Sequence, residues 1–151
     1  NKITGSKEVS WMNIVLDSNV LFSALIKDSL TRRLIFRYDG LFLFPFYIFE
    51  EMEKHKSELL RKSGMEEEEF NLLLQLILKK VLIVPSDILM PHKDKALEIV
   101  GSIDPDDVLF IACCLAYPNS ILWSDDKKLK KQTQIKVFDT NEFRSFMSAD
   151  N

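Results

Sequence analysis

Carboxylate side chains stand beside apolar segments at four separate places along this chain. They are Asp17, Glu50, Glu51, Asp104, Asp106, Asp107, Asp125 and Asp126. Carboxylates that meet within a few ångströms repel one another, so they either take up protons or bind a cation. Oxygen ligands without a Cys or His set favour hard ions such as Mg²⁺ or Mn²⁺, which suit phosphodiester hydrolysis. If the four segments meet in space, the sequence therefore predicts a divalent-cation site.

Short apolar runs alternate with stretches of helical spacing, and this pattern decides where the acids lie. The expected strands cover residues 13–17, 41–44, 81–85, 121–124 and 135–138. The expected helices cover residues 18–26, 47–62, 65–80, 92–100, a stretch opening at 104, and a last stretch opening at 140. The strands lack polar alternation, which is typical of a parallel sheet buried on both faces. We therefore expect a three-layer α/β/α sandwich with a central parallel sheet of four to five strands.

The acids fall at one edge of this predicted sheet. Asp17 closes the first strand, and residues 125–126 directly follow the fourth. Residues 104–107 open the helix before the fourth strand, while residues 50–51 lie early in the helix after the second. In open parallel sheets, functional groups gather at the carboxyl ends of the strands, where helices also begin. We expect the four segments to converge there.

Four segments resemble the motifs of the PIN-domain nucleases, and the resemblance spans about residues 13–146. The segments are VLDSNVLFSAL, YIFEEM, DDVLFIACCLA and LWSDDKKL. The resemblance implies that four acids are catalytic and hold Mg²⁺ or Mn²⁺: Asp17, Glu51, Asp107 and Asp126. It also implies supporting roles for Asn19, Asp104 and Ser124. Neighbouring acids leave the choice between Glu50 and Glu51, and between Asp125 and Asp126, open by one residue.

The activity that this resemblance implies is metal-dependent cleavage of RNA. The resemblance further implies a homodimer. Many members of the family are toxins of toxin–antitoxin pairs, with an antitoxin protein as partner, and others process ribosomal RNA. Basic residues near the acids are candidates to bind substrate phosphates. They are Arg32, Arg33, Lys127 and Lys128, with Lys130 and Lys131 close by. Net charge is only −3, so any contact with nucleic acid must be local.

Length and composition set the remaining expectations. The 151 residues, 46% of them hydrophobic, fit one domain over residues 12–151 after a polar leader at 1–11. Cys113 and Cys114 are adjacent within an apolar run, so we expect two reduced core thiols and a cytoplasmic protein. No apolar run approaches the ~20 residues that span a bilayer, so no membrane association is expected.

Each acid also has a simpler interpretation. Asp17 and Asp104 can cap helices, residues 125–126 can form a turn, and residues 50–51 can be solvated helix acids. His55 fits a helix surface, and Trp123 fits the core. A catalytically inactive PIN-like module that binds RNA or protein is the main alternative function. A phosphatase or receiver-like domain is a weaker one, because the third strand ends without the acid that a receiver needs.

Overall fold

A computed structural model describes residues 12–150 of the chain. The predicted leader at residues 1–11 lies outside the described residues. The strands form one parallel sheet in the order β3-β2-β1-β4-β5. They are β1 (Asn13–Leu16), β2 (Phe42–Pro45), β3 (Val81–Val84), β4 (Ser120–Trp123) and β5 (Lys136–Phe138). The predicted parallel sheet is therefore confirmed, with five strands.

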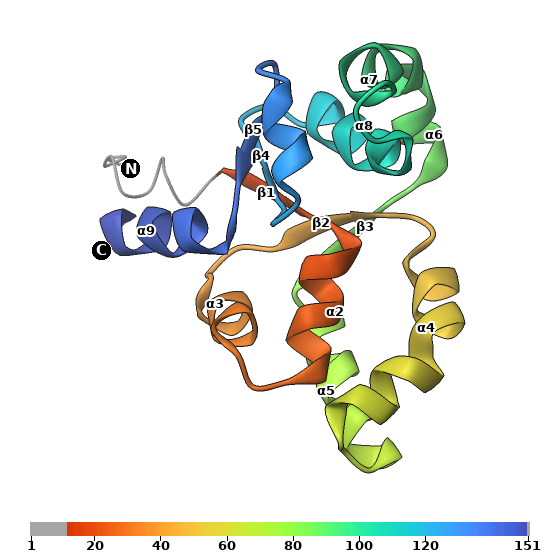
Figure 1. Ribbon diagram of the computed structural model, residues 1–151, viewed down its shortest axis with the longest axis vertical. Helices are drawn as coiled ribbons and strands as arrows, with labels where there is room; N and C mark the ends of the chain where they lie inside the picture. Colours follow the sequence, from red (N-terminus) through yellow and green to blue (C-terminus); the bar gives the residue numbers. More distant parts are fainter. Residues whose placement is uncertain (1–11, 151) are drawn as a thin grey trace, which may run out of the picture.

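Helices connect the strands and cover both faces of the sheet. They are α2 (Ser18–Ile26), α3 (Leu30–Arg37), α4 (Ile48–Ser63), α5 (Glu67–Leu78), α6 (Ser86–Leu89), α7 (Lys93–Val100), α8 (Val108–Ala116) and α9 (Thr140–Asp150), with the 3₁₀ turns η1 (Met90–His92), η2 (Pro105–Asp107) and η3 (Lys127–Lys131). α2, α3, α4 and α5 lie on one side of the sheet, and α6, α7 and α8 on the other (Figure 1). The predicted three-layer α/β/α arrangement is confirmed.

The central strands anchor the core. Ile14, Val15 and Leu16 of β1 are fully buried between β2 and β4. A continuous apolar run of this kind is what a strand covered on both faces requires. Trp123 at the end of β4 is also buried and stacks on Phe143 of α9, with ring centroids 4.2 Å apart. The expected core position of Trp123 is confirmed, and the ends of β1 and β4 are held by packed side chains.

The stretch DPDDVLFIACCLA divides into η2 and the apolar helix α8. α8 packs against β1, β2 and β4 and buries its two free cysteines, Cys113 and Cys114. Burial raises the pKa of the Cys113 thiol to about 12, so the group stays protonated near neutral pH. Although α8 is almost wholly apolar, no helix within residues 12–150 is long and apolar enough to cross a membrane.

The structure adds two α-helices that the sequence pattern did not predict, α3 and the four-residue α6. α3 follows the side-chain cap of Ser29 and buries Thr31, Leu34 and Ile35. Its arginines and its short length hide this apolar face from a periodicity search. The second strand, expected over residues 41–44, runs from Phe42 to Pro45, and the helix expected from 47 begins at Ile48.

Candidate active site

Asp17 stands at the junction of β1 and α2. Its backbone is extended, and its Oδ1 accepts a hydrogen bond from the Val20 N–H at 2.8 Å, so Asp17 is the N-cap of α2. A side-chain oxygen at this position satisfies an N–H that has no helical partner. Only 4% of Asp17 is exposed. The cap and site interpretations of Asp17 do not compete, because the cap fixes where the carboxylate lies.

The end of β4 lies beside the end of β1. The strands pair in parallel with Leu16 opposite Trp123, so the residues that follow them, Asp17 and Ser124, come together. Ser124 is 1% exposed, and its Oγ accepts a hydrogen bond from the Asp126 N–H at 3.1 Å. Asp126 in turn caps η3 through its side chain. Parallel pairing thus brings acids more than a hundred residues apart to one edge of the sheet.

A tight turn presents the acids that precede α8. The Asp104 side chain accepts a hydrogen bond from the Asp106 N–H at 3.2 Å, and Pro105 begins the 3₁₀ turn η2. The Asp107 N–H donates to the Asp104 carbonyl at 3.1 Å. Side chains three residues apart eclipse one another on a 3₁₀ turn. Asp104 and Asp107 therefore face the same way. The helix expected to open at 104 begins as this 3₁₀ turn, and α8 proper starts at Val108.

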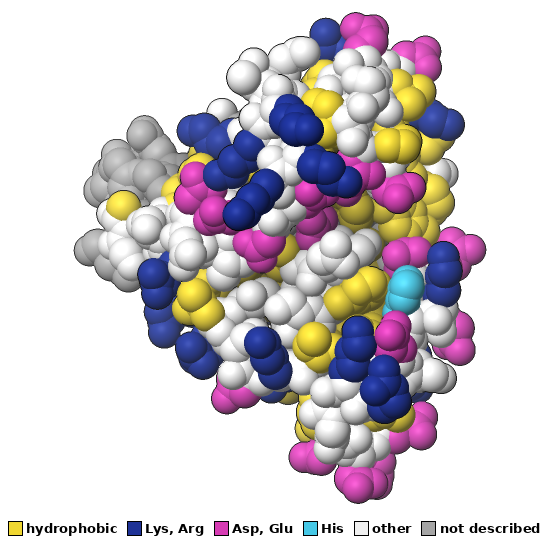
Figure 2. Space-filling model, viewed as in Figure 1, with side chains coloured by type: hydrophobic (Ala, Val, Ile, Leu, Met, Phe, Trp, Pro, Cys, Tyr) yellow, Lys and Arg dark blue, Asp and Glu magenta, His cyan; other side chains and the backbone are white. Residues whose placement is uncertain are grey.

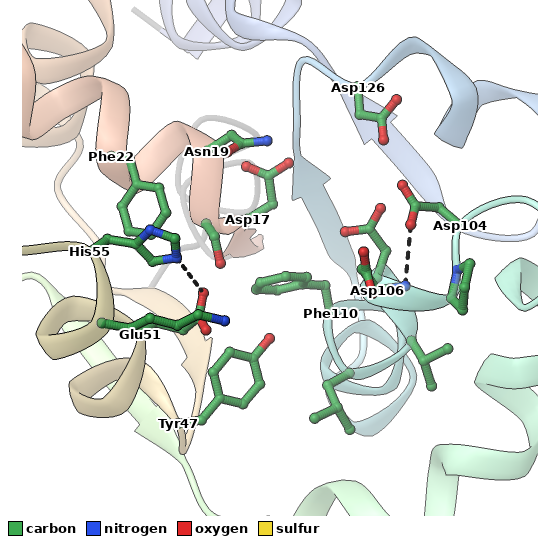
Figure 3. A pocket seen from close by; sticks show the side chains of 16 residues that line it. Asp17, Asn19, Phe22, Tyr47, Glu51, His55, Asp104, Asp106, Phe110 and Asp126 are labelled. Atoms are coloured by element: carbon green, nitrogen blue, oxygen red, sulfur yellow. Dashed lines mark hydrogen bonds and ion pairs between the residues drawn. The ribbon is translucent and has the colours of Figure 1, made fainter. Parts of the chain in front are cut away.

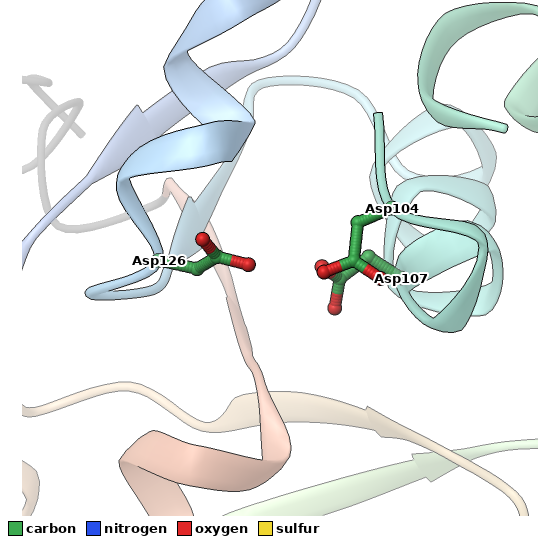
Figure 4. A group of neighbouring side chains, drawn as sticks. All are labelled: Asp104, Asp107 and Asp126. Carbon is green, nitrogen blue, oxygen red and sulfur yellow. The ribbon is translucent and has the colours of Figure 1, made fainter. Parts of the chain in front are cut away.

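Three carboxylates from these segments form a cluster. One oxygen each from Asp104, Asp107 and Asp126 lies within 4.8 Å of the others. Figure 4 shows Asp126, which directly precedes η3, directed toward the other two acids, which project from the turn before α8. Carboxylate oxygens this close are a geometry that a hard cation can bridge.

The cluster lines one side of a pocket of about 610 Å³. Figure 3 shows Asp104, Asp106 and Asp126 on one wall, Glu51, His55 and Tyr47 on the other, and Asp17 between them. The lining residues are Asp17, Ser18, Asn19, Phe22, Tyr47, Glu51, Lys54, His55, Asp104, Pro105, Asp106, Asp107, Val108, Leu109, Phe110 and Asp126. Six of them are acids, so the pocket is strongly acidic.

Two of the acids hold their protons unusually tightly. Burial raises the pKa of Asp17 to about 6, although hydrogen bonds from Ser124 and Val20 oppose the rise. Burial likewise raises the pKa of Asp107 to about 7, and the negative charges of Asp104, Asp17 and Asp126 add to it. Desolvation and like charge both disfavour the ionised form, and a bound cation would relieve the second of these.

The donor set fits a hard divalent cation. Every potential ligand in the three-residue cluster is a carboxylate oxygen, and Asp17 and Glu51 add two more carboxylates to the same pocket. Mg²⁺ and Mn²⁺ prefer oxygen ligands, whereas zinc sites in proteins usually include Cys or His. The composition of the pocket therefore fits Mg²⁺ or Mn²⁺.

A family model described as PIN domain matches residues 15–144. The chain belongs to the PIN-domain family. This is a nuclease-type family, so the match agrees with the resemblance seen in the four sequence segments. Searches of curated proteins and of solved structures gave no match.

The PIN domain brings most of the predicted site residues to this pocket. Asp17, Glu51, Asp107 and Asp126 all line it, and so do the proposed supporting residues Asn19 and Asp104. The third supporting residue, Ser124, lies just behind the pocket, where it hydrogen-bonds Asp17 and Asp126. Asp106 is exposed at the rim of the pocket.

The choice between neighbouring acids follows from where each side chain lies. Glu51 lines the pocket, whereas Glu50 is exposed outside it. Asp125 points to α9, where its carboxylate accepts hydrogen bonds from the Thr140 N–H at 2.7 Å and the Thr140 hydroxyl at 2.8 Å. Asp126 lies in the acidic cluster. The geometry therefore favours Glu51 and Asp126 as the site residues.

The predicted basic residues separate into two groups. Arg32 and Arg33 are not among the pocket residues. The Arg32 guanidinium donates to the Ala24 carbonyl at 2.7 Å, so it serves the C-terminal end of α2, which points away from the acids. Lys128 lies beside the acids, with its Nζ 3.4 Å from an Asp104 oxygen, and Lys127 follows Asp126 directly.

Sequence reasoning missed the aromatic side chains that line the pocket. Phe22, Tyr47 and Phe110 line it, and so does His55, which was expected only on a helix surface. His55 lies one turn after Glu51, with its Nε2 4.0 Å from a Glu51 oxygen. Residues four apart are neighbours on a helix, so the position of His55 relative to Glu51 is the one sequence signal that could have indicated His55.

Proposed function

We propose that this PIN domain is a Mg²⁺- or Mn²⁺-dependent endoribonuclease that hydrolyses RNA phosphodiester bonds. The observation that carries the proposal is the convergence of Asp104, Asp107 and Asp126 oxygens within 4.8 Å, beside the buried Asp17. A structural role alone does not require four acids in one pocket, since their repulsion opposes folding. Membership of a nuclease-type family supports the same conclusion.

The proposed metal ligands and catalytic residues are Asp17, Glu51, Asp107 and Asp126. When bound, a divalent cation would supply Lewis-acid stabilisation of charge on the phosphate and on the leaving oxygen, and would promote ionisation of the attacking water. Ser124 orients two of the acids, through its hydrogen bonds with Asp17 and the Asp126 backbone. Asp104 faces Asp107 across the turn and adds negative charge beside it.

We propose that lysines of η3 bind the substrate phosphates. Lys127 and Lys128 are exposed next to the acids, whereas Lys130 forms an ion pair with Glu142. Figure 2 shows Lys and Arg side chains gathered beside acidic ones over η3. A chain of net charge −3 needs such a local strip to hold a polyanion. Lys128 pairs with Asp104, so cation binding at the acids would release its ammonium group toward the substrate.

The toxin role, the antitoxin partner and the homodimer stay predictions from the family resemblance, and the cytoplasmic location stays a prediction from the two reduced cysteines. Genome context tests the first two, because a toxin predicts a small adjacent open reading frame that encodes its antitoxin. Sedimentation of the purified chain tests the dimer.

Paired substitutions test the proposed activity. Asp17→Asn and Glu51→Gln each remove a proposed ligand charge with little change in shape, and Glu50→Gln is the matched control outside the pocket. We expect the first two to lower Mn²⁺-dependent RNA cleavage by at least about 100-fold, the upper end of what outer-shell partners of metal sites cost, while Glu50→Gln changes it little. Cleavage is followed by sequencing RNA ends.

Calorimetry separates the enzyme from the inactive binding module. The enzyme should bind Mn²⁺ with an affinity that falls in Asp107→Asn. Wild-type protein that binds RNA but neither Mn²⁺ nor Mg²⁺ would favour the module instead. Undiminished cleavage by Asp17→Asn and Asp107→Asn would reject the site assignment.

A further inference from the structure

The pocket has two chemically different sides. Acids occupy one wall, and the opposite wall carries Phe22, Tyr47 and His55 (Figure 3). Its volume of about 610 Å³ is far more than a hydrated ion occupies and lies within the ~300–1,000 Å³ of pockets that hold small organic ligands. The space beside the acids can therefore admit a larger group than a phosphate.

The aromatic wall is open, unlike the aromatic core. Phe22 and His55 pack against each other with ring centroids 4.9 Å apart, and both remain partly exposed in the pocket. The His55 side chain is 34% exposed. By contrast, Phe42 and Trp123 are fully buried by their neighbours. Core packing alone does not account for the open faces of Phe22 and His55.

Tyr47 adds a polar group to this wall. Its ring packs on Phe44 and Phe110, which fixes the side chain. Figure 3 shows its hydroxyl directed toward the interior of the pocket. Within residues 12–150 this hydroxyl makes no hydrogen bond, although a Tyr hydroxyl that is largely buried usually has a partner. A ligand with a polar edge would supply that partner.

We infer that Phe22, His55 and Tyr47 form a nucleobase subsite, which holds one base of a single-stranded nucleic acid next to the phosphodiester at the acids. This inference rests on the proposed function. Every base has a flat face that stacks on aromatic rings, and single strands expose such faces. Phe22 and His55 provide the stacking surface, and the Tyr47 hydroxyl reaches the polar edge of the base. Lys54, exposed at the rim, is placed for the next phosphate.

The test compares a single-stranded RNA with copies that carry one abasic nucleotide at successive positions. Wild-type cleavage, as kcat/KM with Mn²⁺, should fall about 5- to 150-fold for one abasic position, the range that base–aromatic stacking gives. Phe22→Leu should lower cleavage of the intact RNA by a similar factor but leave that abasic RNA unchanged. Phe22→Tyr keeps an aromatic ring, so it should retain the difference in cleavage between intact and abasic RNA. Tyr47→Phe should weaken the preference among the four bases. Phe36→Leu, at an exposed phenylalanine of α3 outside the pocket, is the matched control and should change neither substrate.

Equal losses on intact and abasic RNA in Phe22→Leu would overturn the subsite, because they indicate a general structural effect. Failure of the wild type to cleave any RNA would instead overturn the proposed function. Fluorescence anisotropy with the same RNAs and Mn²⁺ then tests the subsite alone. Weaker wild-type binding of one abasic RNA, with the difference lost in Phe22→Leu, supports it, and equal binding of all RNAs overturns it.

Discussion

At the scale of single residues, Asp17 shows how one side chain serves both structure and site. Its carboxylate caps α2 by accepting the Val20 N–H, and burial in that position raises its pKa to about 6. Asp107, with a pKa raised to about 7, shares the pocket. Both acids are held in an environment that disfavours their charge, so the metal-free fold is least stable when they ionise.

The raised pKa values predict how the stability of the metal-free protein depends on pH. Between about pH 4 and pH 7 the folded state binds more protons than the unfolded state, so the free energy of unfolding should fall as pH rises. Asp17→Asn keeps the cap, because Asn and Asp cap helices equally well, but no longer titrates. We expect it to remove about 1–3 kcal/mol of this decline. Urea denaturation in EDTA at pH 4.5 and 7.5 measures the effect.

The same acids predict the opposite trend with metal. Mn²⁺ affinity and cleavage should rise through pH 6–7, as Asp17 and Asp107 lose their protons. Added Mn²⁺ should also reverse the loss of stability at pH 7.5. If the unfolding free energy in EDTA changes by the same amount between pH 4.5 and 7.5 in the wild type and in Asp17→Asn, the raised pKa of Asp17 is rejected.

At the scale of elements, the starts of helices and turns position the acids. Asp17, Asp104 and Asp126 each cap the element that follows, so the local hydrogen bonds that begin α2, η2 and η3 also aim carboxylates at the pocket. Asp125 likewise accepts a hydrogen bond from the first N–H of α9, that of Thr140, but its carboxylate points away from the pocket. Adjacent residues thus divide between structure and the proposed chemistry.

This division predicts different outcomes at Asp125 and Asp126. Asp125→Ala removes both bonds to Thr140, whose hydroxyl also accepts the Trp123 indole N–H. It should cost about 1–2 kcal/mol of unfolding free energy, as loss of a helix cap does, and leave Mn²⁺ affinity nearly unchanged. Asp126→Asn should weaken Mn²⁺ binding with little loss of stability. Urea denaturation measures the stability of both variants and calorimetry their Mn²⁺ affinity, so each variant is the control for the other. Loss of Mn²⁺ affinity in Asp125→Ala, with loss of stability in Asp126→Asn, would reverse the two assignments.

At the scale of the whole molecule, positive charge is concentrated locally, although the chain as a whole is slightly acidic. The chain has more acids than bases, yet Lys128 of η3 lies beside the acidic pocket, with its Nζ 3.4 Å from an Asp104 oxygen. The proposed RNA binding at this site would involve few phosphate contacts, so its affinity should depend on salt only moderately.

Salt dependence tests which lysines take part. Lys127→Ala and Lys128→Ala should each weaken binding of single-stranded RNA and lower the slope of log affinity against log salt by about 0.7, the value for one contact to a single strand. Lys95→Ala on α7, outside the pocket, is the matched control. Fluorescence anisotropy at several salt concentrations gives the slopes. A slope that changes as much in Lys95→Ala would remove the assignment to η3.

The sequence alone determined the order of the five strands along the chain and the residues that could hold a cation. Apolar runs and Asp-Ser-Asn or Asp-Pro caps are local signals, because the hydrogen bonds and burial that they report lie within a few residues. They located Asp17 and Asp107 without any coordinates. α3 was not predicted, because its apolar face is short and interrupted by arginines.

Only the tertiary structure decided which neighbouring residue reaches the pocket. Glu50 and Glu51 differ by about 100° around α4, and Asp125 and Asp126 part where the chain bends from β4 into η3, so packing against distant elements selects one of each pair. The same packing takes Arg32 to the far end of α2. It also sets Phe22 of α2 against His55 of α4, a contact between segments whose separation in sequence carries no local signal.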